Sequence, residues 1–353
     1  MTASRIVQLL SAALLILLLV TPASAGDRVV ILDGGKSWAV EESTGLRSLP
    51  APAGDVVLHK AAHTASGRLV AGIEQVHRQG KTAERLILWQ YGEDSAERIP
   101  APKQLHDAAT YAPTPLIEDG VLSGLVWIEG FAPNKTRVLA AQRSGAGWSQ
   151  PVAVSEFGPG TQIALDVARL SDGSLLAVWA AYDGEDDEIV WSRYDGTWTR
   201  PRALTANDVP DVTPTLHATK RGAIVAWSGY DGNDYRIQLA DFTSADTATW
   251  SEPRLLQGRG AVSPQFQRTA NDAAVLTWRQ AVPRTWMAAT LRGGELLWAA
   301  PAAAPTTQLE GQPLASIRDG AVQLLWPVAA SENAANTKTG PTTILVPTIV
   351  QRP

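Results

Sequence analysis

Residues 213–256 read TPTLHATKRGAIVAWSGYDGNDYRIQLADFTSADTATWSEPRLL and contain four short strand-like runs separated by turn residues. PTLHAT and YRIQLADF alternate apolar with polar residues, RGAIVAWSG is mostly apolar, and TWSEPRLL follows a polar turn. Alternation with period two is typical of half-buried β-strands, and a short apolar run between turn residues is typical of a buried one. The stretch therefore predicts four consecutive antiparallel strands.

Tryptophans at a regular spacing indicate that this unit is repeated. One series ends an apolar run and recurs at nearly equal intervals: Trp127, Trp179, Trp227, Trp278 and Trp326. A second series opens the last strand-like run of each unit and has the same period: Trp148, Trp198, Trp250 and Trp298. A four-stranded antiparallel unit repeated about every fifty residues is typical of a propeller blade.

The predicted fold is an all-β, six-bladed β-propeller. Its second strands end near Ile73 and at the five tryptophans of the first series. The last unit lacks a fourth strand, and we expect residues 34–42, GGKSWAVEE, to supply it and close the ring, because closure removes exposed strand edges. Indole rings suit the gaps between neighbouring blades, so we expect both tryptophan series to be core, whereas Trp286 lies outside them and is expected to be exposed.

Residues 1–25 have the features of a secretory signal peptide. Arg5 precedes a largely apolar run from Ile6 to Val20, and Ala23-Ser24-Ala25 is a small-residue cleavage site. We expect residues 26–353 to form a single propeller domain that is periplasmic or secreted, monomeric, and without a membrane span after cleavage. The chain has no cysteine, so no disulfide contributes to its stability.

The charge balance argues against two classes of partner. The chain has 30 basic and 35 acidic side chains, a net charge of −5, and no block of Lys or Arg. A nucleic-acid partner and an anionic membrane surface are therefore not expected.

The repeat resembles a known family. Residues 194–208, YDGTWTRPRALTAND, resemble the degenerate BNR repeats of the sialidase-like six-bladed propeller superfamily. The resemblance implies a propeller related to glycan-cleaving enzymes. Sialidases of this superfamily bind the carboxylate of their substrate with three arginines and use a tyrosine nucleophile. The Phe/Tyr-Arg-Ile-Pro motif that carries the first of those arginines does not occur here, so no catalytic residue is assigned.

The turns between the second and third strands of all blades are expected to lie on one face of the ring. These turns carry tyrosines, and their acidic and basic residues lie in different blades. Such side chains suit the binding of saccharide hydroxyls or of a protein loop. The candidate ligand-binding residues on this face are Tyr182, Asp183, Glu185, Asp186, Tyr230, Asp231, Asp234, Arg284 and Trp286.

The acidic run from Asp183 to Glu188, DGEDDE, has two interpretations. Tyr-Asp-Gly also occurs at 194–196 and 230–232, as expected for a turn in which Asp accepts backbone hydrogen bonds and Gly takes positive φ. The run does not fit an EF-hand, because Gly comes second instead of sixth, but a looser calcium site stays open. The acids that the turn does not require are Glu185, Asp186 and Asp187.

Three functions follow as hypotheses. The leading one is an exported, non-catalytic propeller without a required cofactor that binds glycan or a cell-envelope protein. One alternative is a sialidase-like exo-glycosidase. The other is an envelope assembly scaffold.

Overall fold

A computed structural model describes residues 29–350 apart from gaps. The gaps are 33–34, 43–44, 50–53, 79–80, 93–95, 107–108, 133, 245–247, 257–258, 269–272, 282–283, 293–294, 306–312, 319–320 and 330–342. The described residues contain no α-helix and form seven antiparallel sheets. No helix among them is long and apolar enough to cross a membrane. The expected signal peptide lies outside the described residues, so it stays a prediction, as does the domain boundary after it.

The strands follow the repeat closely. The first three sheets contain β1 (Val29–Leu32), β2 (Ser37–Glu42), β3 (Gly45–Ser48); β4 (Asp55–Thr64), β5 (Gly67–Arg78), β6 (Lys81–Tyr91), β7 (Ala96–Ile99); and β8 (Ala109–Glu118), β9 (Val121–Ala132), β10 (Lys135–Ser144), β11 (Gly147–Trp148), β12 (Val152–Ala153). The next two contain β13 (Gln162–Arg169), β14 (Leu175–Tyr182), β15 (Asp187–Asp195), β16 (Thr197–Trp198), β17 (Arg202–Ala203); and β18 (Asp211–Thr219), β19 (Gly222–Tyr230), β20 (Tyr235–Thr243), β21 (Thr249–Trp250), β22 (Arg254–Leu255). The last two contain β23 (Ala261–Arg268), β24 (Ala273–Gln280), β25 (Thr285–Arg292), β26 (Glu295–Ala302); and β27 (Leu314–Arg318), β28 (Ala321–Ala329), β29 (Thr343–Val350).

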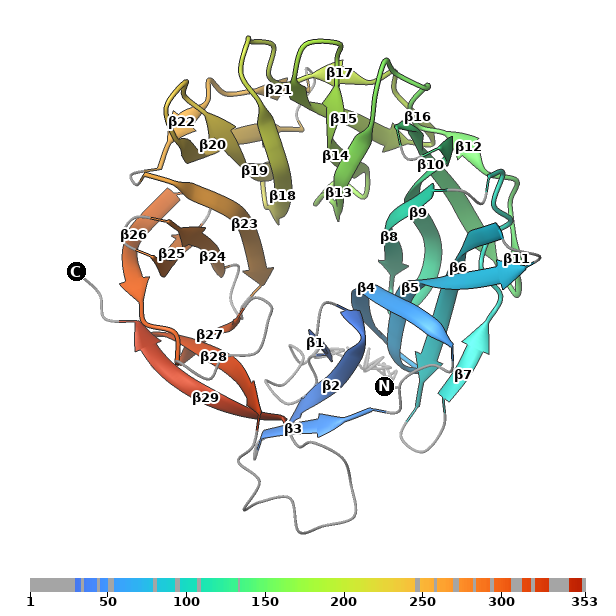
Figure 1. Ribbon diagram of the computed structural model, residues 1–353, viewed down its shortest axis with the longest axis horizontal. Coiled ribbons are helices and arrows are strands. Elements are labelled where there is room, and N and C mark those ends of the chain that lie inside the picture. The colour runs from blue at the N-terminus through green and yellow to red at the C-terminus, as the bar shows by residue number, and fades with distance from the viewer. Residues whose placement is uncertain are drawn as a thin grey trace, which may run out of the picture.

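The sheets lie around a ring, with the first strand of each repeat toward the centre (Figure 1). First strands of neighbouring sheets contact one another, as β8 does with β4 and β13, and as β18 does with β13 and β23. The six repeats expected from the sequence correspond to the six sheets that run from β4 to β29, and their second strands are β5, β9, β14, β19, β24 and β28. The all-β propeller architecture is therefore as predicted.

The N-terminal residues are placed differently from the prediction. The strand around Trp38 is β2, which pairs with β1 and β3 in a sheet of its own instead of joining β28 and β29. This sheet lies between the last and the second sheets, because β3 contacts β29 and β1 contacts β4 (Figure 1). No described strand pairing joins the N-terminal strands to β29, so the expected closure by a shared sheet is wrong for the described residues. Strand β2 is the middle strand of this sheet, with antiparallel neighbours on both sides.

The tryptophans of the first series are core residues. All five, and Trp38 with them, are at most 1 % exposed. Each apolar cluster combines strands of two adjacent sheets; Trp227, for example, packs with Trp191 and Phe242. The second series is half-buried and lies further out. Burial of these rings between adjacent sheets contributes apolar contact that holds the ring together.

The recurring Trp-Ser/Thr-x-Pro phrase forms the interrupted outer strand. After each tryptophan a hydroxyl accepts a backbone N–H of the third strand: Ser149 from Gln142, Thr199 from Arg193, and Ser251 from Asp241, each at 3.0 Å. The proline two residues later has no N–H to donate, so regular pairing stops and resumes as a second short strand.

A β-bulge recurs in the inner strands. The pairing register shifts near residues 112, 164, 213 and 263, and the residue at each position has a positive φ of 47 to 55° although none is glycine: Ala112, Ala164, Thr213 and Ser263. Non-glycine residues rarely adopt this conformation, and bulges change the direction of the side chains that follow.

Candidate functional site

The turn between β14 and β15 has the geometry that the Tyr-Asp-Gly pattern predicts. Asp183 Oδ1 accepts hydrogen bonds from the backbone N–H groups of Glu185 (2.8 Å) and Asp186 (3.3 Å), and Gly184 has φ of 127°. The Tyr182 hydroxyl donates to the Gly184 carbonyl at 2.9 Å. The aspartate is thus a turn residue, as expected, and its second carboxylate oxygen is not used by this turn.

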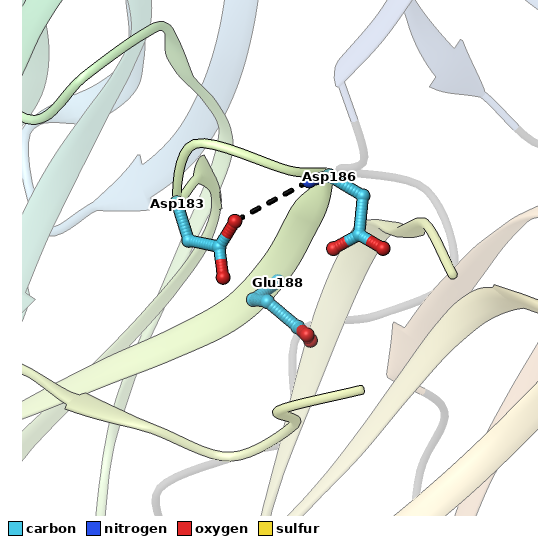
Figure 2. Close-up of side chains that lie close together, drawn as sticks. All are labelled: Asp183, Asp186 and Glu188. Atoms are coloured by element: carbon cyan, nitrogen blue, oxygen red, sulfur yellow. Dashed lines mark hydrogen bonds between the residues drawn. The ribbon is translucent and has the colours of Figure 1, made fainter. Parts of the chain in front are cut away.

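Three carboxylates come together at this turn (Figure 2). One oxygen from each of Asp183, Asp186 and Glu188 lies within 4.8 Å of the others. Glu188, at the start of β15, is only 3 % exposed, and its Oε1 accepts the backbone N–H of Asn207 at 2.6 Å. Two buried oxygens, Glu188 Oε2 and Asp186 Oδ1, have no hydrogen-bond partner. We call Asp183, Asp186 and Glu188 the acidic cluster.

Burial and mutual repulsion perturb the titration of this cluster. Burial raises the pKa of Glu188, and nearby Asp211 and Asp186 raise it further, against hydrogen bonds from Thr205 and Asn207 that lower it. Burial also raises the pKa of Asp186, as do the charges of Asp183 and Asp208. These side chains therefore hold protons more tightly than free carboxylic acids do.

The next repeat has the same turn with a different charge balance. Between β19 and β20, Asp231 Oδ1 accepts from the N–H groups of Asn233 (3.0 Å) and Asp234 (2.8 Å). Here the Arg236 guanidinium forms an ion pair with Asp231, and Arg259 lies 3.8 Å from Asp234. Hydrogen bonds from the Asp234 backbone and from Arg236 lower the pKa of Asp231 to about 2. This second turn therefore carries its own counter-charge.

An aromatic group lies on the turn face of the neighbouring sheet. Rings of His106, Phe131 and Phe157 have centroids 5.3 to 5.9 Å apart, and the Arg137 guanidinium lies 4.7 Å from the Phe157 ring centroid. Phe131, next to the end of β9, is 55 % exposed. Buried Glu129 fixes one side of the group, because it accepts the backbone N–H of His106 at 2.5 Å. We call His106, Phe131 and Phe157 the aromatic group.

Residues 157–161 connect the aromatic group to Tyr182. Lys135 Nζ donates to the carbonyls of Gly158 and Pro159, each at 3.3 Å. Gly160 packs so closely on the Tyr182 ring that an added Cβ would lie 2.6 Å from its Cδ1. The Tyr182 N–H donates to the Thr161 carbonyl at 3.0 Å. The aromatic group and Tyr182, which is 36 % exposed, thus belong to one continuous surface.

A cavity of about 340 Å³ lies among the inner strands β4, β8, β13, β18 and β23. Lys60 Nζ reaches Asp166 Oδ1 at 3.0 Å, and Asp166 Oδ2 accepts from Thr215 Oγ1 (3.2 Å) and from the Leu216 N–H (2.9 Å). The rings of His217 and Phe266 lie 5.6 Å apart in its wall. Asp166, Thr215 and Gln265 are the residues at which regular pairing resumes after each bulge, so the bulges place polar side chains in this wall.

The cavity and the predicted turn residues lie toward opposite ends of the strands. In β13 the cavity is lined by residues 166–169, whereas Gln162, at the other end, pairs with Ala181 beside the Tyr182 turn. Among the described residues that line the cavity, Arg169 is the one arginine.

The predicted ligand residues separate into groups. Tyr182, Asp183, Glu185 and Asp186 share the first turn, while Tyr230, Asp231 and Asp234 share the second. The two turns are joined by residues 207–211, because Asn207 bonds Glu188 and Asp211 while Pro210 accepts the Tyr230 N–H. Arg284 is exposed in the β24–β25 turn.

The expected exposure of Trp286 is wrong. It is 8 % exposed, because its ring packs edge-on against Trp326 with centroids 5.8 Å apart. Its position in β25, facing the next sheet, makes it a core residue outside the two tryptophan series.

Four residues of these sites are not marked by the sequence pattern: Glu188, Phe131, Phe157 and Asp166. Glu188 belongs to the acidic run, and its position two residues after Asp186 is the available signal. The other three acquire their surroundings from segments distant in sequence, so no local pattern marks them.

No protein-family model matches the chain, and no curated protein matches it. Among solved structures, the BP39L lectin from Burkholderia pseudomallei is 14 % identical, with 89 % of this chain and 93 % of that chain covered and a TM-score of 0.55. The polysaccharide lyase Uly1 is 11 % identical (93 % and 90 % covered, TM-score 0.53), as is a protein of unknown function from Dyadobacter fermentans (93 % and 99 %, TM-score 0.52). These likenesses show the fold alone. Neuraminidase-like proteins are also similar, with TM-scores of 0.44 to 0.48.

Proposed function

We propose that the protein binds a saccharide on the turn face, at the aromatic group and the adjoining Tyr182. Phe131 carries the proposal: the residue is 55 % exposed although the rings of His106 and Phe157 pack against it, and the Arg137 guanidinium lies over Phe157. An apolar ring held in place on the surface, with polar groups converging beside it, is typical of a binding site.

Polar groups for saccharide hydroxyls are available on both sides of the rings. Arg137 lies beside Phe157, and Lys135 lies over the segment that leads to Tyr182. The carboxylates of Asp183 and Glu185 follow Tyr182 directly. Because a sugar presents an apolar face and a rim of hydroxyls, this combination suits it better than a purely apolar partner.

A glycan array tests the proposal. We expect binding by the wild-type protein and at least a tenfold loss of affinity for Phe131→Ala. Val121→Ala is the matched control, since Val121 is 63 % exposed at the opposite end of the same strand. Equal glycan binding by both variants, or no binding by the folded wild type, would contradict the proposal.

The central cavity favours a second candidate, a glycosidase of the sialidase-like class. Asp166, Lys60 and His217 place ionisable groups in the wall of one cavity. Turnover of fluorogenic glycosides, sialosides among them, that is lost in Asp166→Asn and kept in Phe131→Ala would favour this enzyme over the binding protein. Turnover lost in Tyr182→Phe or Tyr230→Phe would likewise overturn a purely binding role.

We also propose that the protein is exported to the periplasm or beyond. Its alternative partner there is a cell-envelope protein. Secretion of a fusion through residues 1–25 tests the export. For an assembly scaffold, the expected result is a co-purifying envelope protein together with no glycan affinity.

A further inference from the structure

The acidic cluster places more negative charge in a protected position than its turn requires. Asp183 is needed to hold the turn, but Asp186 and Glu188 contribute no side-chain hydrogen bond to it. Glu188 is 3 % exposed, and its Oε2 and Asp186 Oδ1 are both buried without a partner. A buried carboxylate oxygen without a donor is costly, so such atoms call for an explanation beyond folding.

The equivalent turn in the next repeat gives a direct comparison. Asp231 and Asp234 match Asp183 and Asp186, but the position of Glu188 is taken by Arg236. In that turn the arginine neutralises the aspartate through an ion pair. Among the described ion pairs none involves Asp183, Asp186 or Glu188. One turn thus contains its own cation, and the other replaces that cation with a third carboxylate.

Further acids around the cluster strengthen the same field. Asp208 lies close enough to raise the pKa of Asp186, and Asp211, 1 % exposed, raises that of Glu188. Asp211 is held by hydrogen bonds from Trp227 Nε1 (2.7 Å) and Asn207 Nδ2 (2.8 Å), so it supports the field from a fixed position.

We propose that Asp183, Asp186 and Glu188 bind a divalent cation, with Ca²⁺ as the preferred ion. Ca²⁺ takes six to eight oxygen ligands at about 2.3–2.6 Å, so two ligands of one ion lie at most about 5 Å apart. The separation within 4.8 Å meets this condition. The exposed side of Asp183 leaves room for water molecules to complete the coordination. The cation takes the place that the Arg236 guanidinium has in the next repeat.

The ion would fix the turn that carries Tyr182 against the start of β15. Asp183 borders both sites, but Asp186 and Glu188 are not offered to the saccharide, and neither the aromatic group nor the central cavity contributes a ligand to the ion, so the two proposals can fail separately. A saccharide that fails to bind therefore leaves the cation site untouched, and the converse also holds.

Titration calorimetry of chelator-treated full-length protein with CaCl₂, and separately with MgCl₂, tests the site. We expect one saturable event for Ca²⁺, with a dissociation constant below about 1 mM, and a rise in melting temperature at saturation. Glu188→Gln keeps the acceptor for the Asn207 N–H and should weaken Ca²⁺ at least tenfold. Asp186→Asn should do the same.

Asp234→Asn is the matched control, because it changes the equivalent acid in the turn that holds Arg236. We expect its Ca²⁺ affinity to equal that of the wild type. Circular dichroism establishes that each variant is folded, and terbium luminescence excited through tryptophan gives a second reading of occupancy. Wild-type protein that is folded and shows neither heat nor a melting shift at 5 mM Ca²⁺, a concentration on the order of five times that expected limit, would overturn the proposal. Unchanged Ca²⁺ affinity in Glu188→Gln would also overturn the proposal. Tighter binding of Mg²⁺ than of Ca²⁺ would overturn the assignment of Ca²⁺ as the preferred ion.

Discussion

Glu188 and Arg236 occupy the same position in the turns of two successive sheets and carry opposite charges. Each follows a Tyr-Asp-Gly turn whose aspartate accepts the same pair of backbone N–H groups. Arg236 pairs with its aspartate, whereas Glu188 lies beside Asp183 and Asp186. The two turns therefore have the same backbone conformation and differ in charge, so each serves as a control for variants of the other.

We expect the carboxylates in and around the acidic cluster to favour folding of the metal-free protein increasingly as the pH falls below neutral, whereas His59, whose pKa is lowered by burial to about 4, opposes them on protonation. The pKa values of Asp186, Asp187, Glu188 and Asp211 are all raised, chiefly by burial. An acid with a raised pKa in the folded state favours folding when protonated, and this contribution is lost as the pH rises through that pKa. The difference in urea midpoint between the wild type and Glu188→Gln, followed across the acidic range, separates this carboxylate contribution from that of His59.

Glu188→Gln isolates one group in that profile. The neutral amide removes the repulsion, so the metal-free variant should be more stable than the wild type at neutral pH. The difference should shrink at low pH, where Glu188 is itself protonated. A variant that is equally destabilised at every pH would instead indicate that Glu188 has a purely packing role.

Trp227→Phe should cost more stability than Trp278→Phe. Both indoles are fully buried at equivalent positions, but Trp227 Nε1 donates to Asp211 Oδ1 at 2.7 Å, whereas Trp278 Nε1 has no hydrogen-bond partner. Both changes remove similar volume, so the difference reports the lost bond to a buried carboxylate, about 1–3 kcal/mol. Chemical denaturation of both variants gives this number directly, and equal losses would show that the bond contributes nothing.

Asp166→Ala should loosen the inner strands. Its carboxylate joins β13 to Lys60 of β4 and to Thr215 and Leu216 of β18. Loss of these bonds should destabilise the protein by about 1–3 kcal/mol. Asp166→Asn keeps an acceptor for the Leu216 N–H and should lose less. Hydrogen exchange at Leu216 is the local measurement, and unchanged protection in the alanine variant would contradict the assignment.

Ala164→Gly should raise the free energy of unfolding, whereas Ala168→Gly should lower it. Ala164 lies in a bulge with φ of 54°, where an alanine is strained by roughly 1 kcal/mol and a glycine is not. Ala168, in the same strand, is not among the residues with positive φ, so glycine there should cost about 0.5–1 kcal/mol. Melting temperatures of the two variants test this comparison.

The strands and the repeat could be predicted from the sequence because both depend on local periodicity. The runs ending at Trp127, Trp179, Trp227, Trp278 and Trp326 are strands β9, β14, β19, β24 and β28, with the rings buried as expected. The turn role of Asp183 and Asp231 was equally local, since each bonds the backbone two and three residues ahead.

The N-terminal sheet is the part of the fold that local periodicity does not predict. Trp38 is expected in the fourth strand that the last unit lacks, yet β2 pairs with β1 and β3, and Trp38 is as buried as the tryptophans of the second strands. The pattern around one tryptophan does not specify which strands it pairs with, because pairing depends on the neighbours on both sides.

By itself, the sequence determined the all-β repeat, its period of about fifty residues and the tryptophan core, since hydrophobic alternation and turn residues act over a few positions. Only the tertiary structure decided which side chains meet. Glu188, and neither Glu185 nor Asp187, joins Asp183 and Asp186 because strand alternation turns its side chain inward. His106, Phe131 and Phe157 meet because β9 packs beside the segments before β8 and after β12, a contact between distant residues that no local pattern encodes.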